Sequence, residues 1–428
     1  MIAVFSPSTA RGRIQAPPSK SMAHRLLLCA GLSTGTSVIS NVDLSHDIMA
    51  TLDCLRALGA EVACEDSRVI ICGVDPGEIS HPAVLPCREC GSSLRFMIPL
   101  CLLSGQENRL TGSSTLFKRP LSIYEDICKE QNLYFDKKEG SLTVAGKLSA
   151  GQYVFRGNIS SQFVTGLLFA LPLLKGSSTI RLLPPVVSRP YIDMTLHALS
   201  QFGVKTAIAP SARREDSSLR ALLPDAATLP LEIHVPGGQR YVPRDLEVEG
   251  DYSNAAFFEA LNLLGGDVQV EGLNENSLQG DKILRRYFPQ LQEGFAHVDL
   301  SDCPDLGPVL MALAAALHGG RFTGTKRLSY KESSRGAAMK QELGRMNVRV
   351  DVSENEIVVH PGMSRPQEIL CGHNDHRIVM SLAVLLSVTG GSLSGAEAVA
   401  KSLPDFFDRL SRLGIKMTFE GSGNHTDF

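Results

Sequence analysis

The sequence predicts an α/β protein assembled from repeated units, and two observations carry this prediction. First, an amphipathic helical pattern that stops and then continues into short β-like runs around a polar turn occurs several times. Second, these helices alternate with a set that is much more apolar. With 428 residues, the chain is also long enough for two or three domains, because one core rarely grows beyond about 250–300 residues.

The amphipathic unit is clearest in residues 47–73, DIMATLDCLRALGAEVACEDSRVIICG, and in residues 337–362, AAMKQELGRMNVRVDVSENEIVVHPG. Each stretch predicts a helix, a helix stop and two short strands, in that order. Weaker copies of the same pattern lie at residues 123–146, 194–208, 282–300 and 406–420. The sequence therefore predicts six units.

The apolar helices are expected at residues 23–31, 94–103, 163–174, 255–264, 306–317 and 378–386. A helix that is apolar on all sides is usually buried. Each unit should then hold one buried and one half-exposed helix against a mixed sheet, with the units packed about a common axis. The irregular polar stretch 210–230 is expected to be a loop.

Composition excludes several classes of protein. Lys and Arg total 42 against 45 Asp and Glu, so no overall basic field exists to attract nucleic acid or an acidic membrane. No apolar run approaches the ~20 residues of a membrane span, and the start lacks the apolar core of a signal peptide, so we expect a cytoplasmic protein. The ten cysteines are expected to be reduced. Cys87 and Cys90 form a C-x-x-C pair, but no second pair stands at a suitable spacing, so we expect no metal site.

The starts of the six apolar helices combine capping residues with cations: Ser19-Lys20-Ser21, Gly91-Ser92-Ser93, Ser160-Ser161-Gln162, Gly250-Asp251-Tyr252-Ser253, Pro304-Asp305 and Asp375-His376-Arg377. Capping explains the Ser and Asp residues taken singly. It does not explain Lys20, Arg25, Arg95 and Arg377, because the helix dipole disfavours cations at this end. Exposed N–H groups and nearby cations together suit an anion, so the sequence predicts a local anion site. Basic residues of other segments extend it: Arg119, Lys331, Arg335 and Lys401.

Two carboxylates can have either a purely structural role or a catalytic one. Asp305 can cap the apolar helix that it opens, and Glu332 can be a helix-start carboxylate or a surface ion pair. Beside several cations, however, one of them can serve as a general base and the other, if desolvated, as a general acid.

Eleven segments then resemble the family of 5-enolpyruvylshikimate-3-phosphate (EPSP) synthases, in the family's order and over essentially the whole chain: PSKSMAHR, ECGSSLRF, KRPL, GNISSQFVTGLLFALPLL, SRPYIDMTL, VEGDYSNAAFF, NSLQGD, CPDLGPVLMALA, YKESSR, NDHRIVMSLAV and KSLPDFF. The resemblance implies an inside-out α/β barrel fold with two similar domains, each of three βαβαββ units, and an active site in the cleft between them. We place the discontinuous domain at residues 1–18 and 243–428 and the other at 19–242.

The resemblance also implies the reaction: transfer of the enolpyruvyl group of phosphoenolpyruvate to the 5-hydroxyl of shikimate 3-phosphate, with release of phosphate and without a metal or organic cofactor. Asp305, helped by Lys20, would take the proton of the attacking hydroxyl, and Glu332 would protonate the methylene carbon of phosphoenolpyruvate. The catalytic set implied in this way is Lys20, Asp305, Glu332, His376 and Lys401. The implied ligands of shikimate 3-phosphate are Lys20, Ser21, Arg25, Ser160, Ser161, Gln162, Ser188, Tyr191, Asp305, Arg327 and Lys331. Those of phosphoenolpyruvate are Lys20, Gly91, Arg95, Arg119, Gln162, Arg335, Arg377 and Lys401.

Three positions depart from the family pattern: Glu89 and Ser334 stand where many members have Asn and Asp, and Arg327 stands where some have Asn. Three rival interpretations remain, namely the related UDP-N-acetylglucosamine enolpyruvyl transferase, a non-catalytic anion-binding relative and a scaffold of repeats without a ligand. The first uses a Lys-Asn pair near its start and a loop Cys, where this chain has Lys20-Ser21 and FKRPLS. The resemblance further implies glyphosate sensitivity, and we expect a monomer.

Overall fold

The computed structural model describes residues 1–209 and 230–420. The described chain forms two compact units, one from Met1–Ser19 together with Glu249–Phe428 and the other from Lys20–Val248. We call them the discontinuous unit and the continuous unit. Each has its own apolar core. The expected loop at 210–230 falls almost wholly outside the described residues.

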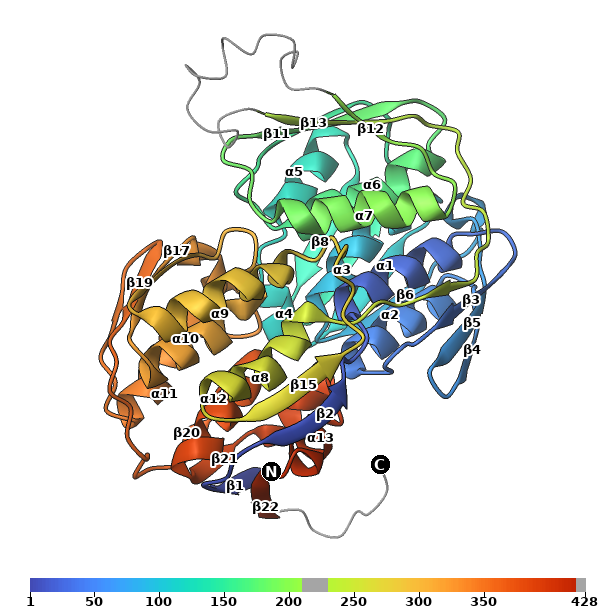
Figure 1. The fold of residues 1–428 in the computed structure, drawn as a ribbon. Helices are drawn as coiled ribbons and strands as arrows, with labels where there is room; N and C mark the ends of the chain where they lie inside the picture. Colours follow the sequence, from blue (N-terminus) through green and yellow to red (C-terminus); the bar gives the residue numbers. More distant parts are fainter. Residues whose placement is uncertain (210–229, 421–428) are drawn as a thin grey trace, which may run out of the picture. The chain divides into compact units, whose positions relative to one another are not determined.

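The continuous unit contains three four-stranded sheets, in the orders β14-β3-β5-β4, β6-β7-β9-β8 and β10-β11-β13-β12 (Figure 1). In each sheet the first two strands pair in parallel and the others pair antiparallel. The strands are β3 (Thr36–Ser40), β4 (Glu61–Glu65), β5 (Arg68–Cys72), β6 (Val84–Arg88), β7 (Asn108–Gly112), β8 (Tyr134–Lys138), β9 (Ser141–Ala145), β10 (Gln152–Arg156), β11 (Ser178–Leu183), β12 (Ala207–Ala209), β13 (Leu231–Val235) and β14 (Leu246–Glu247). The helices are α1 (Lys20–Gly31), α2 (His46–Ala57), α3 (Gly91–Cys101), α4 (Ser114–Lys118), α5 (Ser122–Glu130), α6 (Ser161–Ala170) and α7 (Arg189–Gln201).

The discontinuous unit repeats this plan with two four-stranded sheets, β16-β17-β19-β18 and β20-β21-β1-β22, and the parallel pair β15-β2. Its strands are β1 (Ile2–Ser6), β2 (Arg11–Gln15), β15 (Asp267–Glu271), β16 (Ala296–Asp299), β17 (Gly320–Thr323), β18 (Val350–Val352), β19 (Glu356–Val359), β20 (Leu370–Cys371), β21 (Gly391–Ser394) and β22 (Lys416–Glu420). Its helices are α8 (Tyr252–Leu263), α9 (Leu284–Glu293), α10 (Gly307–Ala316), α11 (Arg335–Arg345), α12 (His376–Thr389) and α13 (Phe406–Arg412). Strand β1, from the start of the chain, lies between β21 and β22 from its end.

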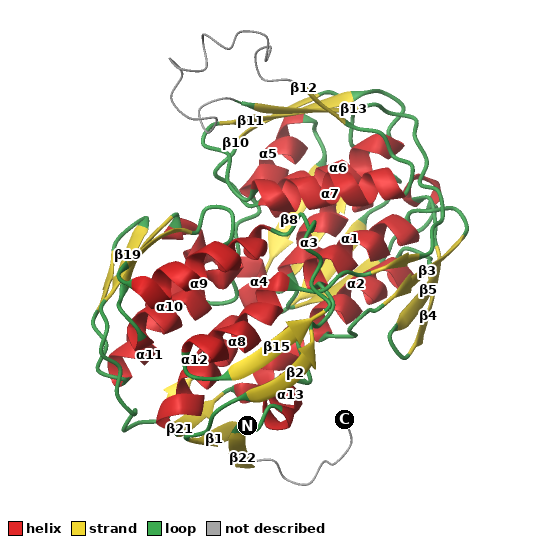
Figure 2. Ribbon diagram, in the orientation of Figure 1, coloured by secondary structure: helices red, strands yellow, loops and turns green. Residues whose placement is uncertain are grey.

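The predicted α/β class and the predicted alternation of helices are confirmed. The six expected apolar helices correspond to α1, α3, α6, α8, α10 and α12, which are buried along most of their length. Within each unit, Figure 2 shows the helices gathered inside and the strands outside. Since an apolar helix needs cover on all sides, this arrangement follows from the sequence pattern.

The amphipathic helices also form as predicted, and in residues 47–73, 123–146 and 337–362 each is followed by the two expected strands. After five of the helices, the turn contains a residue with positive φ, which favours Gly or Asn: Gly59, Asn132, Gly203, Asn347 and Gly414. The other three ranges contain one strand after the helix instead of two: β12 in 194–208, β16 in 282–300 and β22 in 406–420. Strand β16 pairs in parallel with β17 and opens the next sheet.

No helix in residues 1–209 and 230–420 combines the length and the apolar character needed to cross a bilayer.

Candidate active site

The polar starts of the buried helices hold the predicted site residues in two groups, one in each unit. In the discontinuous unit, the group is centred on Arg335, whose side chain is only 1% exposed at the first turn of α11. Its guanidinium donates to Asp305 Oδ1 at 2.8 Å, to Glu332 Oε2 at 2.8 Å and to Asp375 Oδ2 at 2.9 Å. A buried Arg with three carboxylate partners is a rigid anchor, because its planar fork fixes each of them.

Asp305 is shared among the cations of this group. Lys331 Nζ donates to its Oδ1 at 3.0 Å, and Arg377 Nη2 lies 4.0 Å from Oδ2. Burial by itself raises the pKa of Asp305, but Lys331, Arg335 and Arg377 together outweigh burial and hold the pKa well below its usual range. The capping interpretation of Asp305 is wrong, because this residue lies in a short 3-10 helix, Pro304–Leu306, ahead of α10, and its carboxylate accepts from Lys331 and Arg335.

Asp375 caps the N-terminus of α12, and it also belongs to the group of residues around Arg335. Its Oδ1 accepts from the backbone N–H of Arg377 at 2.9 Å, and its Oδ2 accepts from Ser333 Oγ at 3.0 Å and from Arg335. Arg377, buried in the same helix turn, donates to Asn254 Oδ1 at 3.1 Å. Two buried donors here, Arg377 Nε and Asn254 Nδ2, have no hydrogen-bond partner within the described part of the chain. Buried donors of this kind call for an acceptor, such as a water or an anionic ligand.

Asp281 is a further carboxylate of this region that the sequence did not single out. It is buried and accepts a short hydrogen bond from Ser253 Oγ at the start of α8. Burial first, and Asp305 second, raise the pKa of Asp281 to about 7. The pKa values of these two carboxylates are thus shifted in opposite directions, because Asp305 has three cations close by, whereas Asp281 is buried beside the carboxylates of Asp305 and Asp251.

In the continuous unit, Arg25 connects three helices. It is 3% exposed, and it donates from Nε to Thr195 Oγ1 at 2.9 Å, from Nη1 to Ser21 O at 2.6 Å and from Nη2 to Tyr191 O at 2.9 Å. Thr195 Oγ1 in turn hydrogen-bonds Thr165 Oγ1 of α6 at 2.9 Å. Burial lowers the pKa of Arg25 to about 10, so its guanidinium keeps its charge near neutral pH. The predicted residues Ser21, Arg25 and Tyr191 therefore lie together.

A second contact network surrounds the start of α3. Arg95 Nη1 donates to Gln162 Oε1 at 2.6 Å, and Gln162 Nε2 donates to Ser92 Oγ at 2.9 Å. A Cβ built on Gly91 would lie 2.6 Å from Arg119 Nη1 and 3.4 Å from Arg95 Nη1, so two guanidinium groups meet at this glycine. Like charges in such proximity repel, and a bound anion between them relieves the repulsion. Gly91, Arg95, Arg119 and Gln162 are thus brought together as predicted.

The remaining predicted residues lie at helix starts or in 3-10 helices. Lys20 donates to Asp47 Oδ2 at 2.7 Å, and Lys401 donates to Asn374 O at 2.7 Å. Ser160 Oγ accepts from the backbone N–H of Gln162 at 3.4 Å, so it caps α6, where Ser161 is the first residue. Ser188 precedes α7 with φ 54°, His376 is buried at the start of α12, and Arg327 lies in a 3-10 helix over Thr325–Tyr330.

Two of the four helix-start cations also have a carboxylate partner inside the protein. Lys20 Nζ lies 2.7 Å from Asp47 Oδ2, and Arg377 Nη2 lies 4.0 Å from Asp305 Oδ2. The anion site itself stays a prediction. Sequence reasoning missed Asp47, Asp281 and Asp375 as site residues. A signal existed for Asp375, which stands directly before His376 and Arg377, and for Asp281, which ends the NSLQGD segment.

Comparison with known proteins decides the family. The family model of EPSP synthase (3-phosphoshikimate 1-carboxyvinyltransferase) matches residues 4–410. The chain belongs to the EPSP synthase family. The chain is 38% identical to a 3-phosphoshikimate 1-carboxyvinyltransferase of Clostridium kluyveri, over 96% of each protein. It is 35% identical to a protein of the same name from Clostridium perfringens, over 96% of this chain and 98% of the relative.

Solved structures support the same fold at lower identity. An EPSP synthase structure from Acinetobacter baumannii superposes with a TM-score of 0.74 at 20% identity and covers 98% of this chain and all of that one. A second structure of EPSP synthase from that organism gives a TM-score of 0.72 at 21% identity. The family relationship excludes the interpretation of the repeats as a scaffold without a ligand, since the motifs and the fold are those of an enzyme family.

Proposed function

We propose that this member of the EPSP synthase family transfers the enolpyruvyl group of phosphoenolpyruvate to the 5-hydroxyl of shikimate 3-phosphate and releases inorganic phosphate. The observation that carries the proposal is the family match over residues 4–410, which includes every proposed catalytic residue. The charge arrangement supports it, because carboxylates and cations of opposite roles are buried together around Arg335.

The proposed ligands of shikimate 3-phosphate are those given above, with Ser21, Arg25 and Tyr191 from the continuous unit and Asp305 and Lys331 from the discontinuous unit. Phosphoenolpyruvate would be held by Arg95 and Arg119 at Gly91, where two guanidinium groups face one small space. It would also be held by Arg377, whose buried Nε has an open position for an acceptor within the described residues.

Glu332 is the proposed general acid. Its carboxylate accepts from Arg335 Nη2, and an ion-paired carboxylate is a poor proton donor. When the carboxylate or phosphate of phosphoenolpyruvate competes for Arg335, that pairing weakens and Glu332 can hold a proton. Transfer of this proton to the methylene carbon leaves the central carbon electrophilic, and the 5-hydroxyl oxygen attacks it. Loss of phosphate and of a methyl proton from the resulting tetrahedral intermediate restores the double bond.

Asp305 is the proposed base for the 5-hydroxyl. In the free protein its depressed pKa makes it a weak base, because Lys331 and Arg335 stabilise its charge. A substrate that binds Lys331 draws one of these cations away and raises the basicity of Asp305. Lys20, His376 and Lys401 complete the proposed catalytic set. Stabilisation of the departing phosphate by Arg and Lys groups is the main electrostatic contribution that we expect.

The experiment is phosphate release by purified protein, with shikimate 3-phosphate and UDP-N-acetylglucosamine compared as acceptors. We expect release with shikimate 3-phosphate alone, and a loss of about 10²–10⁴-fold in kcat for the isosteric variants Glu332→Gln and Asp305→Asn. Glu354→Gln is the matched control, because Glu354 is an exposed residue of the same unit that pairs with Lys326. Release only with the UDP-sugar would favour the related transferase. Binding without release would favour a non-catalytic relative.

Glyphosate sensitivity, a cytoplasmic location and a monomeric state belong to the same proposal. Glyphosate should compete with phosphoenolpyruvate for the cations at Gly91. Full turnover at glyphosate concentrations well above that of phosphoenolpyruvate would contradict this part. Sedimentation of the purified protein measures the oligomeric state.

A further inference from the structure

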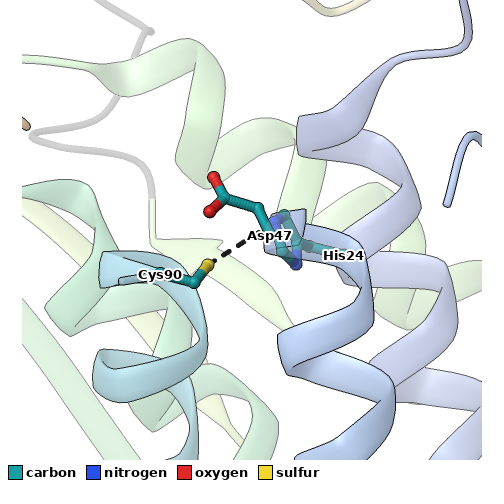
Figure 3. Close-up of side chains that lie close together, drawn as sticks. All are labelled: His24, Asp47 and Cys90. Atoms are coloured by element: carbon teal, nitrogen blue, oxygen red, sulfur yellow. Dashed lines mark hydrogen bonds between the residues drawn. The ribbon is translucent and has the colours of Figure 1, made fainter. Parts of the chain in front are cut away.

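Three buried side chains from three helices converge near the start of α2. His24 of α1, Asp47 of α2 and Cys90, the cap of α3, each offer one ligand atom, and these atoms all lie within 4.8 Å of one another. Figure 3 shows the sulfur of Cys90 directed at the other two side chains. Of the residues that the structure describes, this is the one group of His, Cys, Asp and Glu with such spacing. We propose that His24, Asp47 and Cys90 bind a thiophilic divalent cation such as Zn²⁺.

The imidazole of His24 is oriented for this role. Its Nδ1 forms a hydrogen bond of 2.8 Å with Thr51 Oγ1, so Nε2 faces Cys90 Sγ at 4.0 Å. Thr51 Oγ1 is itself fixed by Ser93 Oγ at 2.8 Å. A distance of 4.0 Å is long for a hydrogen bond and close to the ~3.6 Å between the nitrogen and sulfur ligands of tetrahedral zinc. A hydrogen bond on the far ring nitrogen is the usual outer support of a metal-bound histidine.

The charge states of His24 and Cys90 suit a metal that ionises its own ligand. Burial, aided by Lys20 and Arg25, lowers the pKa of His24 well below its usual value, so the ring is neutral and has a lone pair to donate. Burial first, and Asp47 second, raise the pKa of the Cys90 thiol to about 12. On binding, the cation forms a bond to the sulfur, and the S–H proton leaves to solvent. A thiolate ligand selects Zn²⁺ over Mg²⁺.

Lys20 is the group that the cation must displace. Its Nζ lies 2.7 Å from Asp47 Oδ2, and its side chain is 16% exposed, so it can turn outward when Asp47 binds metal. The sequence considered Cys90 together with Cys87, but the structure separates their roles, because Cys87 Sγ lies 3.9 Å from Cys54 Sγ. A metal at Asp47 would inhibit the enzyme through Lys20. This consequence rests on the proposed function, whereas binding itself does not.

The first test is titration of the full chain with Co²⁺, without substrates, followed by absorption spectroscopy. We expect one equivalent to give a thiolate-to-cobalt band and the visible bands of tetrahedral cobalt, and Zn²⁺ to remove both. Cys90→Ser should abolish the thiolate band, and His24→Asn should abolish the tetrahedral bands. Thr51→Val should weaken affinity about 10–100-fold, because it removes only the outer support.

Cys87→Ser is the matched control, because it removes a buried thiol of the same region that the proposed site does not use. Circular dichroism melts establish that each variant is folded. A thiolate band that persists in Cys90→Ser, or that disappears in folded Cys87→Ser, would overturn the site.

The second test measures phosphate release with added Zn²⁺, relative to the metal-free rate of each variant. We expect inhibition that a chelator reverses, and at least a tenfold higher inhibitory concentration for Cys90→Ser. Spectroscopic binding without inhibition would overturn the link to Lys20. A chain that releases no phosphate under any condition would refute the proposed function, while the cobalt titration would still decide the site.

Discussion

Arg335 illustrates how single residues set the chemistry of this molecule. Its guanidinium is buried, which by itself lowers its pKa, yet Asp375, Glu332 and Asp305 together raise that pKa above its usual value. Each of these carboxylates is stabilised as an anion in return. Removal of one partner from such a group leaves an uncompensated buried charge, which typically costs about 3–5 kcal/mol. Substitutions in this cluster therefore need isosteric controls before they are interpreted as catalytic effects.

Asp281→Asn should change how stability depends on pH. The folded pKa of Asp281 is about 7, above the ordinary value of 3.8, so the native state binds a proton there that the unfolded state has released. The contribution of Asp281 is fully present below about pH 4 and is lost as the pH rises through about 7. We expect urea denaturation to show that the wild type loses stability relative to Asp281→Asn over this window, by an amount on the order of a few kcal/mol.

The control for Asp281→Asn is Asp267→Asn, the same Asp-to-Asn replacement at an exposed position of the same unit. Its stability relative to the wild type should vary little between pH 4 and 8. An Asp281→Asn variant whose difference from the wild type is constant across that range would show that Asp281 does not titrate there.

At this scale, the sequence predicted the proposed reactive residues and missed their partners. Asp305, Glu332 and Arg335 stand in recognisable segments. The pairing of Arg335 with Asp375, by contrast, joins positions 40 residues apart, and that of Lys20 with Asp47 joins positions 27 apart. Such pairs depend on how helices pack, and packing has no local pattern in a single sequence.

The elements were more predictable than the contacts, because helix periodicity is local. All six apolar helices form where the pattern placed them, since each must bury its whole surface. The failure at residues 282–300 has a physical cause. Strand β16 follows α9 where the first strand of a hairpin was expected, but it pairs in parallel with β17 of the next unit. Strand pairing is decided by tertiary context, which the alternation of residues does not contain.

The start of α3 yields a prediction at the scale of the element. Gly91 opens this helix with an ordinary φ, so Ala introduces no backbone strain. The added Cβ would lie 2.6 Å from Arg119 Nη1, the far end of a flexible side chain, which must move. We expect Gly91→Ala to fold with an unchanged Tm and to raise the KM for phosphoenolpyruvate about tenfold or more, because Arg119 leaves its position. Steady-state kinetics with each substrate varied measures the effect.

Gly344→Ala is the matched control for Gly91→Ala. Gly344 lies inside α11, and a Cβ there would meet open space. Ala at this position should stabilise the protein by about 0.5–1 kcal/mol and leave both KM values unchanged. A Gly91→Ala variant with wild-type kinetics would show that Arg119 is not held at this glycine for phosphoenolpyruvate.

At the scale of the whole molecule, the two units differ in their continuity along the chain: one is a single stretch and the other is made of two stretches. Residues 20–248 contain their own core and three four-stranded sheets. Residues 249–428 lack β1, which joins β21 to β22, and β2, which is the partner of β15. We expect fragment 20–248 to unfold cooperatively when expressed alone, and fragment 249–428 to lack a cooperative transition in circular dichroism.

A circular rearrangement tests the cause of that difference. In this variant, fragment 249–428 is followed by a flexible linker and then by residues 1–19. It contains both missing strands and should unfold cooperatively. Cooperative folding of 249–428 without residues 1–19 would show that the two N-terminal strands are dispensable.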